Sequence, residues 1–237
     1  KYANLPIIIL TSSDDIKDKV DSFDEGADEY ITKEMDRQEI EKRLTSIIRR
    51  YRQNLDSNPL THLPGNNVIQ HEIQRRISAG ETFAACYCDL DNFKAYNDAY
   101  GFVEGDQIIR FSAEVIKKSL KLIGNSNDFL GHIGGDDFIF LTTPDKAENI
   151  CNQIFSLMDE GISGFYTEED RNQGYIISKN RQGEEQQFPL VSISIAVVSN
   201  DLRPISSLAE VSKIASELKK VAKNKPGNSY AFDQRIQ

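Results

Sequence analysis

Acidic side chains gather in two short segments that could carry metal-dependent chemistry, residues 86–106 (CYCDLDNFKAYNDAYGFVEGD) and 131–140 (GHIGGDDFIF). In the first, Asp89 and Asp91 end a strand-like run, where sheets flanked by helices commonly place ligand sites. Such a carboxylate pair suits Mg²⁺, a hard cation that takes oxygen ligands from protein and phosphate.

A helix is expected to begin directly after this acidic pair, with Asn92, Phe93 and Lys94 as its first residues. The free amide N–H groups at a helix N-terminus, together with the helix dipole, form an anion site. A phosphate bound there would lie beside the carboxylates, as a nucleotide bridged by a cation requires.

Two adjacent glycines in the second segment predict a tight hairpin turn. Gly134 and Gly135 separate two apolar strands, and the turn is expected to project Asp136 and Asp137 beside the strand that carries Asp89. Three or four carboxylates converging on one edge repel each other unless a cation lies among them. Either motif alone could be an ordinary cap or turn, but the two together favour a metal-dependent site.

The composition limits the classes of function. Of 237 residues, 39% are hydrophobic and 27% charged, as in ordinary globular proteins, and the net charge is −9. This charge argues against a nucleic-acid polymer as partner, but not against a nucleotide bound through a cation. No apolar run is long enough to span a membrane and no signal peptide is visible, so we expect a cytoplasmic protein. The first residue, Lys1, is not Met and suggests a fragment.

The cysteines show no metal-ligand or CxxC spacing. Cys86 and Cys88 would share one face of a strand, and all three cysteines are expected to be small buried residues in a reducing compartment.

The first 55 residues show alternating strand and helix patterns. We expect strands over residues 5–10 and 28–32, the first of them buried, and helices over 15–25 and 36–55. This order indicates the second half of a doubly wound α/β unit. The second helix carries an apolar seam that suits either a coiled coil or packing on the sheet: Ile40, Leu44, Ile47, Ile48, Tyr51 and Leu55.

A stretch rich in turn-forming residues, 58–67, marks the boundary between domains 1–55 and 56–237. Beyond it, Asn66 or Asn67 is expected to cap a helix that ends at Gly80. Further strands are expected over residues 82–90, 129–133, 138–142, 190–198 and 229–232, with an extra hairpin over 164–188 and a solvated acidic loop over 167–170. Helices are expected up to residue 123 and over 145–159 and 206–223. Hairpins mixed with helices are typical of a ferredoxin-like α+β sheet.

The paired acidic segments resemble the GGDEF family. Its signature, roughly D-x-D-x-F-K-x-x-N-D-x-x-G-H-x-x-G-D, is matched by Asp89, Asp91, Phe93, Lys94, Asn97, Asp98, Gly101, Gly105 and Asp106. Its hairpin is matched by Gly134, Gly135, Asp136 and Phe138, its entry motif by NPLTHLP and its late strand by VSISIAVV. The resemblance covers about residues 56–233. It implies a nucleotidyl-cyclase-like fold and the condensation of two GTP into cyclic di-GMP by a homodimer, each domain holding one GTP.

The resemblance also implies a role for each matched residue. The Asp89 side chain, the Leu90 carbonyl and Asp137 would ligate Mg²⁺ or Mn²⁺, while Asp136 would help to activate the ribose 3′-hydroxyl or hold a second metal. The remaining residues would bind substrate: Asn97 and Asp106 the guanine edge, and the amides of Asn92 and Phe93, with Lys94 and Lys223, the phosphates.

Five positions depart from the family pattern: Asp137 replaces Glu, His132 replaces Arg, Phe102 replaces His, Lys225 is the only substitute for an Arg near Lys223, and Asn125 replaces the Arg of the inhibitory R-x-x-D motif. The shorter Asp137 changes the reach of the acid by about 1.5 Å, and misplacement on the scale of 1 Å can cost about a hundredfold in rate. We expect the product-inhibition site to be lost, with Asp128 an ordinary turn residue. His132 is expected to be partly buried rather than catalytic.

Residues 1–55 resemble the last two strands and helices of a two-component receiver domain, through PIIILTSS and GADEYITK. The resemblance assigns phosphoryl recognition to Thr11 and Lys33, with Glu34 in place of the usual Pro. The alternative for Thr11 is a plain helix cap. The family's phosphoaccepting Asp has no counterpart in this sequence, although a sensor kinase would be a partner of a complete receiver.

The sequence therefore supports two hypotheses. The first is a Mg²⁺-dependent diguanylate cyclase, active as a homodimer within a response regulator. The second is a non-catalytic domain that binds GTP or cyclic di-GMP and signals through partner contacts.

Overall fold

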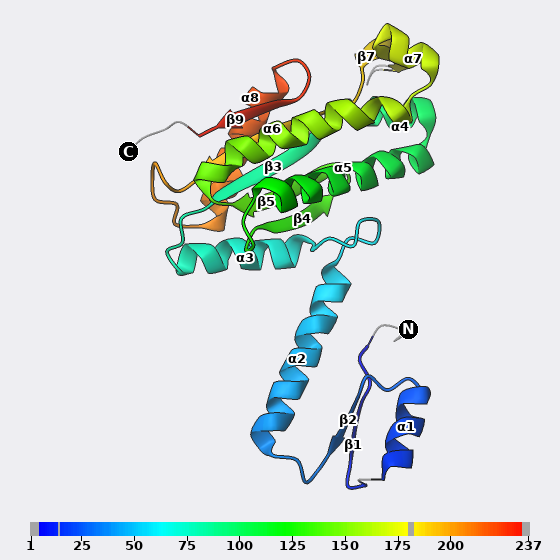
Figure 1. Cartoon of the computed structure of the whole chain (residues 1–237), viewed down its shortest axis with the longest axis vertical. Coiled ribbons are helices and arrows are strands. Elements are labelled where there is room, and N and C mark those ends of the chain that lie inside the picture. Colours follow the sequence, from blue (N-terminus) through cyan, green and yellow to red (C-terminus); the bar gives the residue numbers. More distant parts are fainter. Residues whose placement is uncertain (1–4, 14, 180–182, 234–237) are drawn as a thin grey trace. The chain divides into compact units, whose positions relative to one another are not determined.

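The computed structural model describes residues 5–13, 15–179 and 183–233; the side chains of residues 50–55 and 179 lie outside the description. The chain divides into two compact units, residues 1–56 and 57–237. Each is described by itself (Figure 1). Within the described residues, no helix is both long enough and apolar enough to cross a membrane.

The first unit alternates strands and helices: β1 (Ile8–Thr11), α1 (Ile16–Asp24), β2 (Glu29–Thr32) and α2 (Arg37–Asp56). β1 and β2 pair in parallel, as a doubly wound unit requires. The expectation that the first strand is buried is wrong, because Leu10 is 57% exposed. Thr11 does not cap α1; its hydroxyl accepts a hydrogen bond from Ser13 N–H, and Asp15 is the cap.

The apolar seam of α2 is only partly buried. Ile47 is buried and Ile48 is 43% exposed, while the side chains of Tyr51 and Leu55 lie outside the described residues. The helix begins after Asp36, whose carboxylate accepts a hydrogen bond from Gln38 N–H at 2.8 Å, as expected for a cap.

The second unit is built on a five-stranded sheet in the order β4-β5-β3-β8-β9. Its strands are β3 (Ala84–Asp91), β4 (Phe129–Gly134), β5 (Asp137–Thr142), β8 (Ser192–Ser199) and β9 (Ser229–Phe232). All pairs are antiparallel except β8 with β9, which is parallel. The strands expected from the sequence are therefore present, within a few residues of their expected ends.

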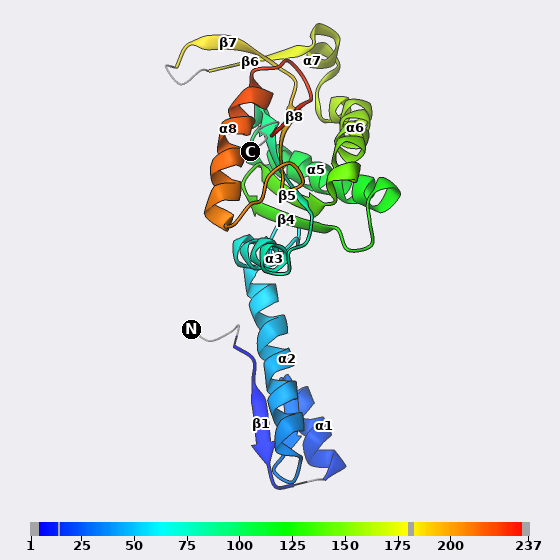
Figure 2. The ribbon, with the colours of Figure 1, turned by 90° about the vertical axis from the view of Figure 1, so that its left-hand side faces the viewer.

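Helices cover both faces of this sheet, as Figure 2 shows. α3 (Asn66–Ser78) and α8 (Leu208–Lys223) pack on the face that contains Phe83, Ala85 and the odd-numbered residues of β5. α4 (Phe93–Tyr100), α5 (Phe102–Ile123) and α6 (Pro144–Gly161) pack on the opposite face, which contains Cys86 and Cys88. The three cysteines are free and buried, as expected.

Residues 162–189 form an insertion between α6 and β8. It comprises the 3₁₀ helix η1 (Ile162–Phe165), α7 (Glu168–Gln173) and a hairpin of β6 (Tyr175–Lys179) with β7 (Glu185–Pro189). The hairpin agrees with the sequence prediction. The prediction of a loop over residues 167–170 is wrong, because Thr167 accepts a hydrogen bond from Asp170 N–H and caps α7. The acidic residues of the first turn stabilise the positive end of the helix dipole. The expected side-chain cap of α3 is also wrong, because its N-cap is Gly65.

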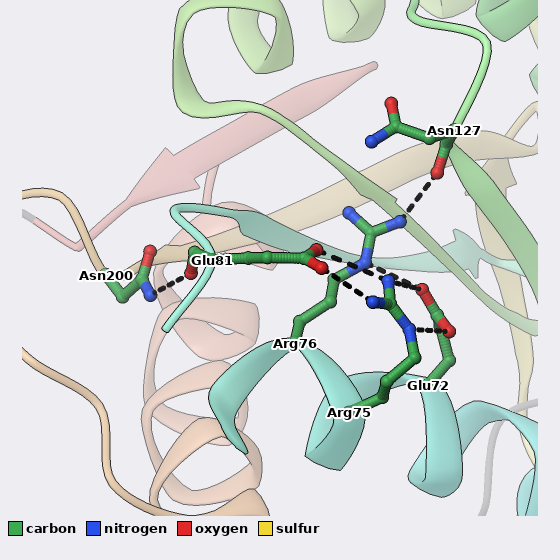
Figure 3. A network of polar contacts seen from close by, with 6 residues as sticks. All are labelled: Glu72, Arg75, Arg76, Glu81, Asn127 and Asn200. Atoms are coloured by element: carbon green, nitrogen blue, oxygen red, sulfur yellow. Dashed lines mark hydrogen bonds and ion pairs between the residues drawn. The ribbon is translucent and has the colours of Figure 1, made fainter. Parts of the chain in front are cut away.

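A network of charged side chains on α3 connects this helix to the loop before β4 (Figure 3). Glu72 accepts hydrogen bonds from both Arg75 and Arg76. Arg76 is buried and donates a further hydrogen bond to the Asn127 carbonyl at 2.7 Å. The hydrogen bond from Arg75 is the main reason that the pKa of Glu72 is lowered to about 2. The network thus joins α3 to the loop before β4.

Replacing the shared acid tests this network. We expect Glu72→Gln to lower the free energy of unfolding by about 1–2 kcal/mol at pH 7, because Arg76 loses its ionic partner while buried. The folded pKa lies below the unfolded value, so this stability is present above about pH 4.5 and is lost as the pH falls towards 2. Urea unfolding at a series of pH values should therefore show wild type and variant converging under acid conditions. A difference that persists undiminished below pH 3 would contradict this account.

Candidate functional site

Two carboxylates face each other across neighbouring strands of the sheet. In the β3–β5 register, Asp89 lies directly opposite Asp137. Side chains alternate along a strand, so Asp89 and Asp91 continue the sheet face on which Phe83 and Ala85 contact α3 and α8. The acids are therefore held on the α8 face by strand pairing rather than by a flexible loop.

Two lysines of α8 contact these acids. The Lys219 amine contacts both Asp89 and Asp137, and its hydrogen bond to Asp137 measures 2.5 Å. The Lys223 amine contacts the other oxygen of Asp89 and lies 4.0 Å from Asp91. The two side chains lie one helical turn apart and so on the same face of α8.

The charge of Asp89 reaches Asp91, Asp136 and Asp137, so the acids share one edge as predicted, but they do not form a cluster of three or four metal ligands. In the described part of the chain, no group of three His, Cys, Asp and Glu side chains is arranged to hold a metal ion. Asp91 instead accepts hydrogen bonds from the hydroxyls of Ser194, at 2.6 Å, and Ser192. Lys219 is the positive charge shared by Asp89 and Asp137, while Lys223 contacts Asp89 and lies 4.0 Å from Asp91.

Burial dominates the electrostatics of this edge. It raises the pKa of Asp91, Asp136 and Asp137 above the ordinary value, and the charge of Asp89 raises them further. Burial alone would lower the pKa of Lys219, but its hydrogen bonds to Asp137 and Asp89 outweigh this effect and raise the pKa. The edge therefore favours a cation among its acids.

The donor set fits a hard divalent cation. Asp89 is 5% exposed, and both acids offer only oxygen, the ligand that Mg²⁺ and Mn²⁺ take up. The ammonium group of Lys219 already stands where one positive charge can contact both carboxylates.

The hairpin turn carries Asp136 to the same end of β3. Gly134 and Gly135 both have positive φ, of 148° and 57°, which glycine adopts without strain. The Asp136 carbonyl accepts a hydrogen bond from Leu90 N–H at 3.4 Å, while the Leu90 side chain is buried in the core. Asp136 and Leu90 therefore lie beside the two facing acids, as the sequence predicted.

A second polar position occurs where α4 meets α5. The Asn97 side-chain oxygen is buried and has no hydrogen-bond partner among the described residues. A Cβ at Gly105 would lie 1.8 Å from this oxygen, so only glycine leaves it room. Asp106, the next residue, is exposed. The structure thus brings Asn97 close to the α5 turn that carries Asp106, with an acceptor that a ligand donor could satisfy.

The expected phosphate-binding residues lie at the start of α4. Asn92 is its N-cap in a left-handed conformation, with φ of 61°, and the Phe93 side chain is buried in the core. Lys94 is exposed. α4 therefore begins immediately after the acidic end of β3, as predicted.

His132 connects the entry turn of this unit to the hairpin. It is buried, its ring stacks on Phe138, and its Nδ1 lies 2.9 Å from the Thr61 hydroxyl. Its Nε2 lies 3.0 Å from the Gly135 carbonyl. Because the carbonyl can only accept, Nε2 carries the proton and Nδ1 accepts from Thr61. Burial lowers the pKa of His132, which favours this neutral form. The residue is buried, as expected.

Three further departures from the family pattern lie at Asn125, Lys225 and Phe102. Asp128 accepts hydrogen bonds from Asn125 N–H and the Thr142 hydroxyl, as expected of a turn residue. The Lys225 amine donates a hydrogen bond to the Tyr230 carbonyl at 2.9 Å. Phe102 is 77% exposed.

Lys219 is the site residue that sequence reasoning missed. The sequence feature that could have indicated Lys219 is its spacing of four residues from Lys223 on an amphipathic helix. The buried residues of this helix include Leu218 and Ala222. Helical spacing shows that two side chains share a face, but not that the face meets two acids of the sheet.

A five-stranded sheet that is antiparallel except for its last pair, with helices on both faces and two facing acids at the end of β3, has the α/β architecture of nucleotidyl-cyclase-like domains. The family described as "Diguanylate cyclase, GGDEF domain" matches residues 53–229, so the chain belongs to the GGDEF family.

Relatives place this domain within larger proteins. The chain is 34% identical over 108 residues to the cyclic di-GMP phosphodiesterase PdeR of Escherichia coli, covering 44% of this chain and 15% of the relative. It is 26% identical over 177 residues to the response regulator PleD of Caulobacter vibrioides, covering 68% of this chain and 38% of PleD. It thus spans well under half the length of these curated relatives.

A solved structure shows the same fold. The coiled coil and GGDEF domain of DgcB from Caulobacter crescentus, in complex with c-di-GMP, superposes with a TM-score of 0.55 at 21% identity. The match covers 82% of this chain and 95% of that one. At this identity the likeness supports the nucleotidyl-cyclase-like fold alone.

A methyl group at Gly105 tests the Asn97 position. We expect Gly105→Ala to weaken GTP binding at least about tenfold, because the new Cβ displaces the Asn97 amide that would bind the base. Gly164→Ala is the matched control, since a Cβ at Gly164 meets nothing within 4 Å. Titration with a fluorescent GTP analogue measures both. Equal affinity in the two variants would remove Asn97 from the proposed base site.

The role of His132 is tested by removing its two hydrogen bonds. We expect His132→Phe to lower the free energy of unfolding by about 2–3 kcal/mol, because the Thr61 hydroxyl and Gly135 carbonyl lose their partner. His71 is exposed, so His71→Phe should leave stability nearly unchanged. Urea unfolding of the full chain measures both, and an unchanged midpoint for His132→Phe would exclude the link.

Proposed function

We propose that this chain is a diguanylate cyclase that condenses two GTP into cyclic di-GMP at a site completed by a second copy. One observation carries the proposal: Asp89 and Asp137, from facing strands, share one positive charge at the acidic edge of a GGDEF domain. Such an edge would hold Mg²⁺ or Mn²⁺ through Asp89, Asp137 and the Leu90 carbonyl.

Different residues of the chain would bind the metal, the base and the phosphates. A bound divalent cation would neutralise phosphate charge and stabilise the attacking and leaving oxygens. Asn97 and Asp106 would bind the guanine edge, and a base that leaves the buried Asn97 oxygen unsatisfied would be rejected. The N-terminus of α4, with Lys94 and Lys223, would hold the phosphates.

Asp136 would take the proton of the ribose 3′-hydroxyl, because burial raises its pKa and makes it a stronger base than an exposed carboxylate. The oxygen so formed attacks the α-phosphorus of the second GTP, and pyrophosphate leaves. Since each domain would hold one GTP, pairing of two domains supplies proximity and orientation.

Residues 1–56 would make this pairing responsive to a signal. Their parallel β-α-β-α order and the match to PleD support a receiver fragment, with Thr11 and Lys33 at adjacent strand ends. A sensor kinase would then be the partner of a complete receiver.

Two features of the site favour a second function, non-catalytic nucleotide binding. The lysine amines already balance the charge of Asp89, and Asp137 is shorter than the usual Glu. A domain of this kind could bind GTP or cyclic di-GMP without catalysis and signal through partner contacts.

Product analysis separates these functions. The full chain, incubated with GTP and Mg²⁺ or Mn²⁺ over a range of protein concentrations, should form cyclic di-GMP at a rate that rises more than linearly with protein. Asp89→Asn should abolish the product, and Asp137→Glu should raise the rate about tenfold or more by restoring the reach of the acid. Measurable GTP binding without product in wild type and Asp137→Glu would replace the cyclase by the binding domain.

A further inference from the structure

The Lys219 amine occupies the space between the two facing acids. It contacts Oδ2 of Asp89 and Oδ1 of Asp137, which belong to strands paired at directly opposite positions. The side chain is 28% exposed, while that of Asp89 is 7% exposed. This position is where a cation that bridges both carboxylates would have to lie.

The buried Asp89 needs a positive partner at all times. Leaving an ionised carboxylate buried and unpaired costs several kcal/mol, and Asp137, opposite it, adds repulsion. Lys219 relieves both, since it contacts both acids at once. The same contacts mean that a divalent ion binding these acids must displace the amine or lie beside it, and charges of equal sign repel.

Lys223 differs from its neighbour. It is more exposed, at 42%, contacts Asp89 alone and lies 4.0 Å from Asp91. It can turn towards a phosphate without leaving Asp137 unpaired, whereas Lys219 cannot. The two lysines of α8 therefore have separable roles.

We propose that Lys219 is a tethered counter-cation that holds the facing acids together when no metal is bound and competes with the divalent ion for them. It thereby sets the metal concentration at which the site fills. The inference rests on the proposed function only in taking Asp89 and Asp137 as metal ligands. Once displaced, the amine is free to contact substrate phosphate, so metal should bind more tightly when GTP is present.

The test measures Mn²⁺ binding to the full chain by electron paramagnetic resonance of the free ion, without nucleotide. Lys219→Met keeps the aliphatic stem and removes the charge, and should bind Mn²⁺ at least about tenfold more tightly than wild type. Lys219→Arg keeps the charge and should stay within about twofold. Lys220→Met, an exposed neighbour on α8, is the matched control and should not change the affinity.

A second readout concerns stability. Without metal, Lys219→Met should unfold at a lower temperature than Lys220→Met, and Mn²⁺ should raise its melting temperature by more. Lys219→Gln serves the same purpose if the Met variant does not fold. Unchanged or weaker Mn²⁺ binding by the neutral variants would overturn the proposal. Tighter Mn²⁺ binding by the neutral variants without any cyclic di-GMP formation would support the counter-cation role of Lys219 and count against the proposed cyclase activity. No Mn²⁺ binding by any variant or by wild type would overturn both the counter-cation role and the cyclase activity.

Discussion

The structure depends on charge balance at one edge of a buried sheet. Pairing of β3 with β5 places Asp89 opposite Asp137, and side-chain alternation turns both towards α8. Asp89 is almost fully buried and Asp137 only half-buried, and two facing acids of this kind repel each other unless a cation lies between them. The chain meets this constraint with Lys219 and Lys223, whose helical spacing matches the edge they cover.

The remaining elements hold this edge in place. The His132 ring joins the hairpin turn to the entry segment through the Thr61 hydroxyl, so the turn that carries Asp136 is linked to the point where the chain enters the domain. On the other face, the absent side chain of Gly105 lets α5 approach α4 and leaves room for the Asn97 oxygen, which is buried and has no hydrogen-bond partner among the described residues. The two polar positions are thus fixed by the packing of separate helices on one sheet.

Much of this arrangement could be predicted from the sequence, because it follows from local rules. A Gly-Gly turn between apolar runs predicts a hairpin, and a strand that ends in D-L-D predicts acids at its edge. What could not be predicted depends on side-chain direction across long separations. The D-L-D spacing groups Asp91 with Asp89, yet Asp91 accepts a hydrogen bond from the Ser194 hydroxyl of β8. Local spacing cannot identify Lys219 as a site residue, because its acidic partners lie more than 80 residues away. An apolar run also predicts that Leu10 is buried, but it does not reveal that, within the described residues, β2 is the one strand paired with β1.

The position of the metal tests the account most directly. Crystals of the full chain grown with Mn²⁺ and a non-hydrolysable GTP analogue would be measured at the manganese absorption edge. The account predicts an anomalous peak within ligand distance of the Asp89 and Asp137 carboxylates, with the Lys219 amine moved away from both. A bound nucleotide with its metal elsewhere, and Lys219 still between the two acids, would contradict it.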